Sequence, residues 1–127
     1  MRRECINSSR GPAPAGPYSH AIRDDNYVFV TSQLGIDPAT GRLIDGGTAA
    51  QARQAMENLS AVLEAAGSSL DQVVKTTVFL MEMGDYPAVD NLYAEFFSGA
   101  PPARSTIQVS GLPLGALVGV DAVALWS

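Results

Sequence analysis

The 127-residue sequence holds one cysteine and one histidine, Cys5 and His20. A lone cysteine cannot form a disulfide within the chain, and its place in an irregular segment rich in serine, proline and glycine does not favour a catalytic thiol. No His/Cys/Glu cluster has the spacing of a metal site, and no glycine-rich phosphate loop joins a strand to a helix. We therefore expect neither a metal nor a nucleotide cofactor.

Long apolar runs are also missing. No run approaches the about 18 residues of a membrane span, and the N-terminal arginines precede no hydrophobic secretory segment. These features predict a cytoplasmic protein with no membrane partner. A chain of this length with 46% apolar residues supports a single domain. We place that domain at residues 12–127 and expect residues 1–11 to form a flexible tail.

Positive charge is scarce. The net charge is -5, and Arg2, Arg3 and Arg10 against Glu4 leave -7 on the remainder. Beyond residue 10, the cations are Lys75 and four arginines. Because lysine and arginine supply most non-specific affinity for nucleic acid, nucleic-acid binding is disfavoured.

Periodicity and turn residues predict an α+β domain with a mixed sheet of five or six strands and two helices on one face. A capping-box pattern, Thr48 with Gln51, predicts the start of the first helix, and Gly67 its end. Asp85 is the expected cap of the second helix, with Pro87 in its first turn. The predicted strands cover residues 18–23, 27–32, 73–81, 104–109 and 117–125, with a tight turn at 37–41.

Two helices cover only one face of such a sheet. Yet the segments 73–80 and 117–125 carry apolar residues at both odd and even positions, and so on both faces. An antiparallel sheet that is open to water on one side usually alternates strongly between apolar and polar residues. We therefore expect the second face to be buried by self-association. The sequence alone does not give the number of copies.

Arg104 is the strongest candidate for a ligand-binding charge. Pro101 and Pro102 restrict the backbone to extended or turn geometry just before a strand, so the arginine has a fixed direction. A planar guanidinium in a fixed place is a receptor for a carboxylate. The alternative is an internal ion pair, with Asp90 or Asp121 as the acid.

Several segments carry a family resemblance: AGPYSHAI at 15–22, YVFVTSQLGIDPATG at 27–41, the helix and strand at 51–80, VDNLYAEFF at 89–97, and PPARSTIQVSGLPLGALVGVDAVAL from Pro101. Together they resemble the YjgF/RidA family of reactive-intermediate deaminases. The resemblance implies a chorismate-mutase-like fold and a homotrimer whose sites lie between subunits.

The resemblance also implies site residues. Arg104 matches the carboxylate-binding arginine of the family, and Tyr18, Ser32 and Thr106 match positions that line the pocket. The family's asparagine falls on Asp90, with Asn91 beside it. Each of these residues also has a purely structural alternative in turns or packing. His20 shares a strand face with Tyr18, but we expect it to be an exposed or hydrogen-bonded surface residue.

One departure from the family pattern concerns catalysis. Gly119 stands where the family carries the glutamate to which water activation is assigned. Asp121 lies on the same strand face, about 7 Å further along. Our hypothesis is that the space left by Gly119 holds a water relayed to Asp121, which makes Arg104 and Asp121 the candidate catalytic residues.

The resemblance implies hydrolysis of enamines and imines of 2-oxo acids, such as 2-aminoacrylate/2-iminopropanoate and 2-iminobutanoate, to the 2-oxo acid and ammonia. The protein would hold the carboxylate, orient a water and accept its proton. Two alternatives remain open. One is a trimer that binds small carboxylates with little or no catalysis, and the other is an endoribonuclease, which the acidic composition disfavours.

Overall fold

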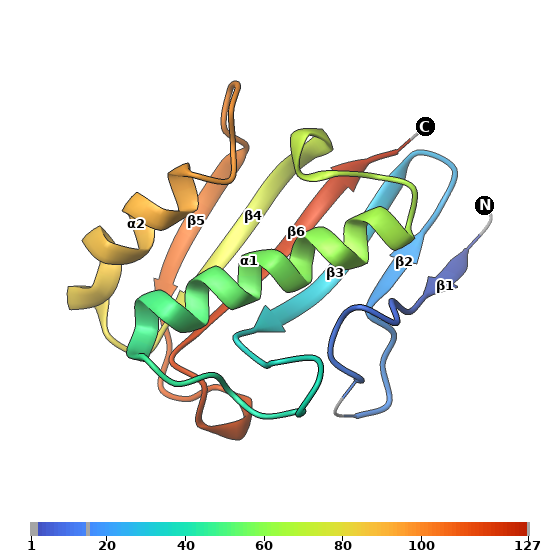
Figure 1. Cartoon of the computed structure of the whole chain (residues 1–127). Helices are drawn as coiled ribbons and strands as arrows, with labels where there is room; N and C mark the ends of the chain where they lie inside the picture. Colours follow the sequence, from blue (N-terminus) through green and yellow to red (C-terminus); the bar gives the residue numbers. More distant parts are fainter. Residues whose placement is uncertain (1–2, 15, 127) are drawn as a thin grey trace.

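Two helices lie on one face of a six-stranded sheet in the computed structural model, which describes residues 3–14 and 16–126 (Figure 1). The strands are β1 (Glu4–Ile6), β2 (Ala21–Arg23), β3 (Tyr27–Leu34), β4 (Val73–Leu80), β5 (Ala103–Gln108) and β6 (Val118–Leu125). The helices are α1 (Gly47–Ala65) and α2 (Tyr86–Ala94), and short 3-10 helices cover Leu70–Gln72, Met83–Asp85 and Pro113–Gly115.

The sheet has the order β1-β2-β3-β6-β4-β5, so β1 and β5 are its edges. The pair β4–β5 is parallel, and the other neighbouring pairs are antiparallel. The parallel pair arises because α2 connects the two strands across one face of the sheet. The predicted single α+β domain, with a mixed sheet and both helices on one face, is confirmed.

The N-terminal segment is more ordered than the sequence indicated. Cys5 pairs with Ile22 in the β1–β2 ladder, although residues 1–11 were expected to be an irregular tail. His20 is 3% exposed, so the expectation of a surface histidine is wrong. Its Nδ1 atom accepts a hydrogen bond from the Ser8 N–H (2.9 Å), and its Nε2 atom donates to the Pro12 carbonyl. A neutral imidazole thus holds the N-terminal segment against the start of β2.

The helix boundaries were predicted well, but their capping was not. Gly46, with a φ of 115°, precedes α1, and no side chain caps the helix. Thr48 Oγ1 instead donates to Asp85 Oδ2 (2.6 Å), and Gln51 Oε1 accepts the Leu117 N–H (2.9 Å). The predicted capping box is therefore wrong. Asp85 does precede α2 at the N-cap position, but its side chain bonds Thr48 and does not cap the helix.

The core lies between α1 and the sheet, where Met56, Leu59 and Leu63 pack against β-branched and leucine side chains of β3, β4 and β6. At Gly35, an added Cβ would lie 2.5 Å from the Gln51 Cα, so only glycine allows this approach of chain and helix. Asn58, 1% exposed, donates to the carbonyls of Leu34 (3.0 Å) and Ile36 (2.8 Å). The end of β3 is thereby fixed to α1.

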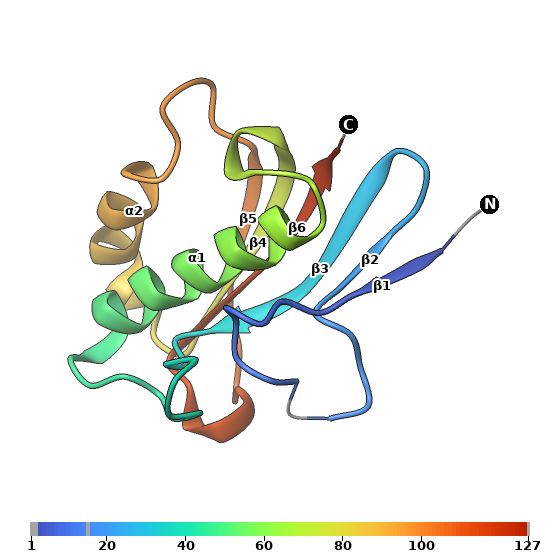
Figure 2. The ribbon, with the colours of Figure 1, turned by 45° about the vertical axis from the view of Figure 1, so that its right-hand side comes forward.

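The other face of the sheet carries no helix (Figure 2). Its large apolar side chains include Phe29, Ile107 and Leu125, each more than 40% exposed. This arrangement agrees with the expectation from the sequence that helices bury one face only. Within the described ranges, no helix is long and apolar enough to cross a membrane.

We predict that Asn58→Ala destabilises the fold by about 2–4 kcal/mol, because two buried carbonyls lose their donor. Urea unfolding of the variant and of the unmodified protein measures the difference. Glu57→Ala, at the exposed neighbouring position of α1, is the control and should change stability by less than about 0.5 kcal/mol. Equal stability of the two variants would contradict the assigned role of Asn58.

Candidate functional site

Arg104 lies on the edge strand β5 and points toward the helical face of the sheet. It pairs with Thr76 of β4, whose buried hydroxyl shares a hydrogen bond with the Tyr93 hydroxyl of α2 (2.8 Å). Since paired residues of neighbouring strands project to the same face, Arg104 is directed at α2. The side chain of Arg104 is 17% exposed.

The guanidinium is held by three residues of α2. Its Nη2 atom donates to Asp90 Oδ1 (2.5 Å) and to the Tyr86 hydroxyl (2.9 Å). The Cζ atom of the guanidinium lies 4.6 Å from the centre of the Tyr93 ring and 5.4 Å from the centre of the Tyr86 ring. Within the described chain, Nη1 and Nε make no hydrogen bond, so these N–H groups remain available to a ligand.

Partial burial works against the charged form of Arg104, but the hydrogen bonds from Nη2 to Asp90 and Tyr86 outweigh it and raise the pKa of the guanidinium. The group is cationic throughout the accessible pH range. The predicted alternative, an internal ion pair with Asp90, is therefore present. Asp90 is itself 49% exposed, so this pair lies at a surface and not inside the core.

A cavity of about 550 Å³ opens beside this pair. It lies between α2 and β5, and the loop at Pro101 and Pro102 closes one side. Arg104, Asp90 and Thr106 all line it, as the resemblance implied. Asn91 is exposed and does not belong to the lining, because a helix turns neighbouring side chains by about 100°.

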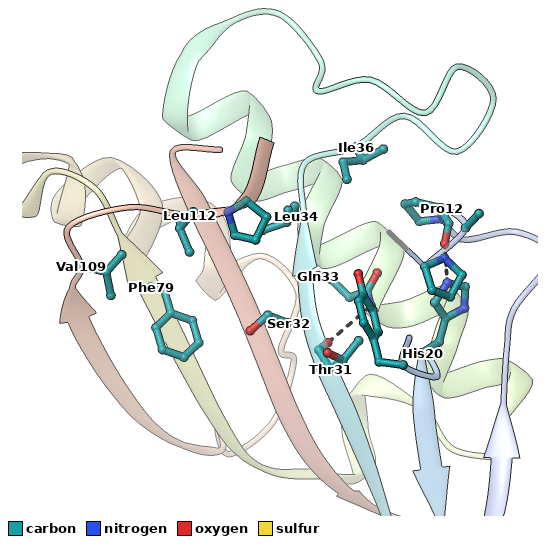
Figure 3. Close-up of a pocket in the computed structure, with 14 residues that line it drawn as sticks. Pro12, His20, Thr31, Ser32, Gln33, Leu34, Ile36, Phe79, Val109 and Leu112 are labelled. Atoms are coloured by element: carbon teal, nitrogen blue, oxygen red, sulfur yellow. Dashed lines mark hydrogen bonds between the residues drawn. The ribbon is translucent and has the colours of Figure 1, made fainter. Parts of the chain in front are cut away.

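Tyr18 and Ser32 line a different cavity, of about 440 Å³. Figure 3 shows Ser32 and Thr31 between Phe79 and Val109 at one end and His20 with Pro12 at the other. Most of this lining is apolar, and it includes Leu34 and Leu112. Within the chain, the predicted binding residues are therefore divided between two cavities.

Asp121 faces the side of the sheet that carries no helix. It pairs with Thr77, and its Oδ1 atom accepts the Thr77 N–H (3.2 Å). Arg104 pairs with the preceding residue of β4, so the sheet separates Asp121 from Arg104 within the protomer. The two predicted catalytic residues do not meet in one copy of the chain.

Gly119 lies next to Leu34 and Leu112, which both line the cavity of about 440 Å³. An added Cβ would lie 3.2 Å from Leu34 Cδ2 and 3.9 Å from Leu112 Cδ2. The water relay from this position to Asp121 stays a prediction.

Tyr86 and Tyr93 border the site, although the sequence analysis did not name them as ligand neighbours. A signal was present in the spacing. Tyr86, Asp90 and Tyr93 follow at steps of four and three, so they share one face of the helix. That face is the one toward Arg104. No cluster of His, Cys, Asp or Glu side chains suited to a metal occurs in the described residues.

Comparison with known proteins agrees with this fold. The model of the family described as "Endoribonuclease L-PSP" matches residues 8–126. Protein DfrA from Myxococcus xanthus is 45% identical over 98% of this chain and 97% of its own length. The 2-iminobutanoate/2-iminopropanoate deaminase of Mus musculus is 42% identical over 97% of this chain and 91% of its own length.

Among solved structures, the Rid-family protein YyfA from Yersinia pestis superposes with a TM-score of 0.94 at 38% identity, covering 98% of this chain and 99% of that one. The chain thus belongs to the endoribonuclease L-PSP family, also called YjgF/RidA or Rid. Members of this family carry different names, and the deaminases are among them.

We predict that Tyr93 ionises at a higher pH than an ordinary tyrosine, because burial raises the pKa of its phenol above the ordinary value. The stability that the neutral phenol contributes is present below the unfolded-state pKa of about 10 and is lost as pH rises through the folded pKa. Titration of phenolate absorbance tests this. Tyr93→Phe should remove the last component to titrate, and Tyr27→Phe should not; the reverse would contradict the assignment.

Proposed function

We propose that the protein hydrolyses the C=N bond of 2-imino acids, with Arg104 holding the substrate carboxylate. The observation that carries this proposal is the guanidinium fixed between Tyr86, Tyr93 and Asp90 at the wall of an open cavity, with Nη1 and Nε unused. A cation oriented in this way recognises a small carboxylate. The names of the deaminase relatives support the choice of 2-iminopropanoate and 2-iminobutanoate as substrates.

In the proposed reaction, water adds to the imine carbon and its proton passes to an acceptor. The resulting carbinolamine loses ammonia as its hydroxyl becomes the carbonyl of the 2-oxo acid. Binding the carboxylate at Arg104 fixes the position of the neighbouring imine carbon, which converts a free encounter into an oriented one. The reaction consumes one water for each ammonia released and needs no cofactor.

The proposal includes a homotrimer in which the cavity at Arg104 meets the cavity at Tyr18 and Ser32 of a neighbouring copy. Three features support it: β5 is an edge strand, the cavity beside it is open, and the sheet face without helices exposes large apolar side chains. Association of that face buries the apolar side chains and adds Tyr18 and Ser32 to the arginine site.

The proton acceptor is the part of the site in which this chain differs from the family pattern. Gly119 supplies no carboxylate, and Leu34 is the side chain nearest to it. This observation favours a second candidate function, a trimer that binds small carboxylates with weak or no hydrolysis. The two candidates share Arg104 and differ in whether ammonia is released.

Cleavage of RNA is the weaker proposal, although the family description names an endoribonuclease. Arg104 is the one cation among the described residues that line its cavity, and Asp90 neutralises it. Binding of a nucleic-acid backbone requires several cations along a groove. We therefore expect a small 2-imino or 2-oxo acid, and no nucleic acid, as the partner of this site.

We predict that Arg104→Lys weakens binding of 2-oxobutanoate by at least about tenfold, because an ammonium group cannot reproduce the two-point contact of a guanidinium. Calorimetric titration of the two proteins measures the change. Arg53→Lys is the matched control, since Arg53 pairs with Glu95 on the exposed side of α1 and does not line the cavity. Unchanged affinity in the Arg104 variant would remove this residue from the binding site.

Gly119→Glu tests whether the chain is an enzyme that lacks an efficient proton acceptor. We expect ammonia release from 2-iminobutanoate, generated in the assay by a PLP-dependent dehydratase, to rise by about 10²-fold or more. Gly119→Gln is the matched control, because it displaces Leu34 in the same way without adding a carboxylate. Equal rates for the two variants, together with an inactive Asp121→Asn, would assign proton transfer to Asp121 instead.

A further inference from the structure

The cavity at Arg104 has an unusual charge balance for a carboxylate receptor. Of the described residues that line it, Arg104 and Asp90 alone carry a formal charge, and these charges cancel. A simple receptor for anions would leave the cation uncompensated. Here a bound 2-oxo acid gives the cavity a net charge of -1, whereas a ligand with one carboxylate and one cationic nitrogen leaves the cavity neutral.

The hydrogen bonds place Asp90 next to any carboxylate that Arg104 binds. Asp90 and Tyr86 both accept from Nη2, which has two N–H groups. Each edge of a guanidinium that offers two parallel N–H groups includes Nη2. A ligand carboxylate bound at two points must therefore share or take over one N–H of Nη2. When it replaces Tyr86, it is bound to the nitrogen that Asp90 also bonds, so it lies next to the Asp90 carboxylate.

Two carboxylates in contact repel each other unless a positive charge lies between them or next to them. The guanidinium supplies one charge for both. A cationic nitrogen on the ligand carbon adjacent to the carboxylate supplies the second. Asp90 has an oxygen for it: Oδ1 bonds Arg104, while Oδ2 has no hydrogen-bond partner in the described part of the chain, and the side chain is 49% exposed.

The geometry points to Asp90 as the residue that selects zwitterionic 2-iminio acids over anionic 2-oxo acids. This inference rests on the proposed function, since it assigns the charge of the substrate at the same site. Arg104 binds the carboxylate, and Asp90 Oδ2 accepts a hydrogen bond from the iminium N–H. When hydrolysis replaces the nitrogen by a carbonyl oxygen, the ligand loses its positive charge, and Asp90 then favours release of the product.

The test compares two stable ligands of the same size, 2-aminobutanoate, which is zwitterionic, and 2-oxobutanoate, which is anionic. Their dissociation constants are measured by calorimetry at neutral pH. We expect Asp90→Asn to weaken the binding of 2-aminobutanoate and to strengthen the binding of 2-oxobutanoate. The ratio of the two dissociation constants should change by about tenfold or more. Inhibition of ammonia release by 2-oxobutanoate should become stronger in the same variant.

Two further variants sharpen the result. Asp90→Glu keeps the charge and should keep the preference for the zwitterion. Asp25→Asn removes an exposed carboxylate in the turn between β2 and β3, which controls for the net charge of the protein, and should leave the ratio unchanged.

If Asp90→Asn changes the dissociation constants of both ligands in the same direction, Asp90 only competes with the ligand for Arg104 and does not select between ligands. The inference is then overturned, while Arg104 remains the proposed carboxylate site. An unchanged ratio overturns it as well. If Arg104→Lys leaves the binding of both ligands unchanged, the proposed function itself fails. This failure can be told apart from failure of the inference on Asp90, because it is measured with the Arg104 variant and does not depend on the ratio of the two dissociation constants.

Discussion

The pleat of β4, β5 and β6 decides which residues of this protein can act together. Thr76, Arg104 and Ala122 are paired across the three strands and face the helices, while Thr77, Ser105 and Asp121 face the other side. A change of one residue in register would reverse every one of these directions. Because α2 covers the helical side, its side chains complete the surroundings of Arg104, and Asp121 is excluded from them.

The contacts of Arg104 combine the two alternatives that the sequence left open. The guanidinium forms an internal ion pair, with Asp90, and it also borders an open cavity with two of its nitrogens unused. A partly exposed pair of this kind adds little stability. Its value lies in orientation, since Tyr86, Tyr93 and Asp90 hold the cation in one place before any ligand arrives.

Much of the fold was predictable because its signals are local. Helix periodicity, the end of α1 at Gly67 and the short strands all follow from spacing and turn residues, and the pairing of a β2–β3 hairpin follows from their proximity. Contacts between distant segments were not predictable in this way. Thr48 and Gln51 have the pattern of a capping box, yet their side chains bond Asp85 and Leu117, which no local pattern reveals.

In the site, too, residues with a local signal were predictable, and contacts between distant segments were not. Arg104 was identifiable from its Pro-Pro entry and from the family motif, and the lining of its cavity by Asp90 and Thr106 agrees with that motif. The burial of His20 was missed because its partners, Ser8 and Pro12, lie in a segment with no periodic signal. The closeness of Leu34 to Gly119 was not predictable, because β3 and β6 are paired although they lie far apart in the sequence.

The central claim is that Arg104 binds the acid group of a small substrate in a site completed by a neighbouring copy. A crystal structure of the assembled protein with bound 2-oxobutanoate tests it most directly. Our account predicts the ligand carboxylate on the Arg104 guanidinium, with Tyr18 or Ser32 of an adjacent subunit in contact with the ligand. A ligand bound elsewhere, with Arg104 still paired only with Asp90 and Tyr86, would contradict it.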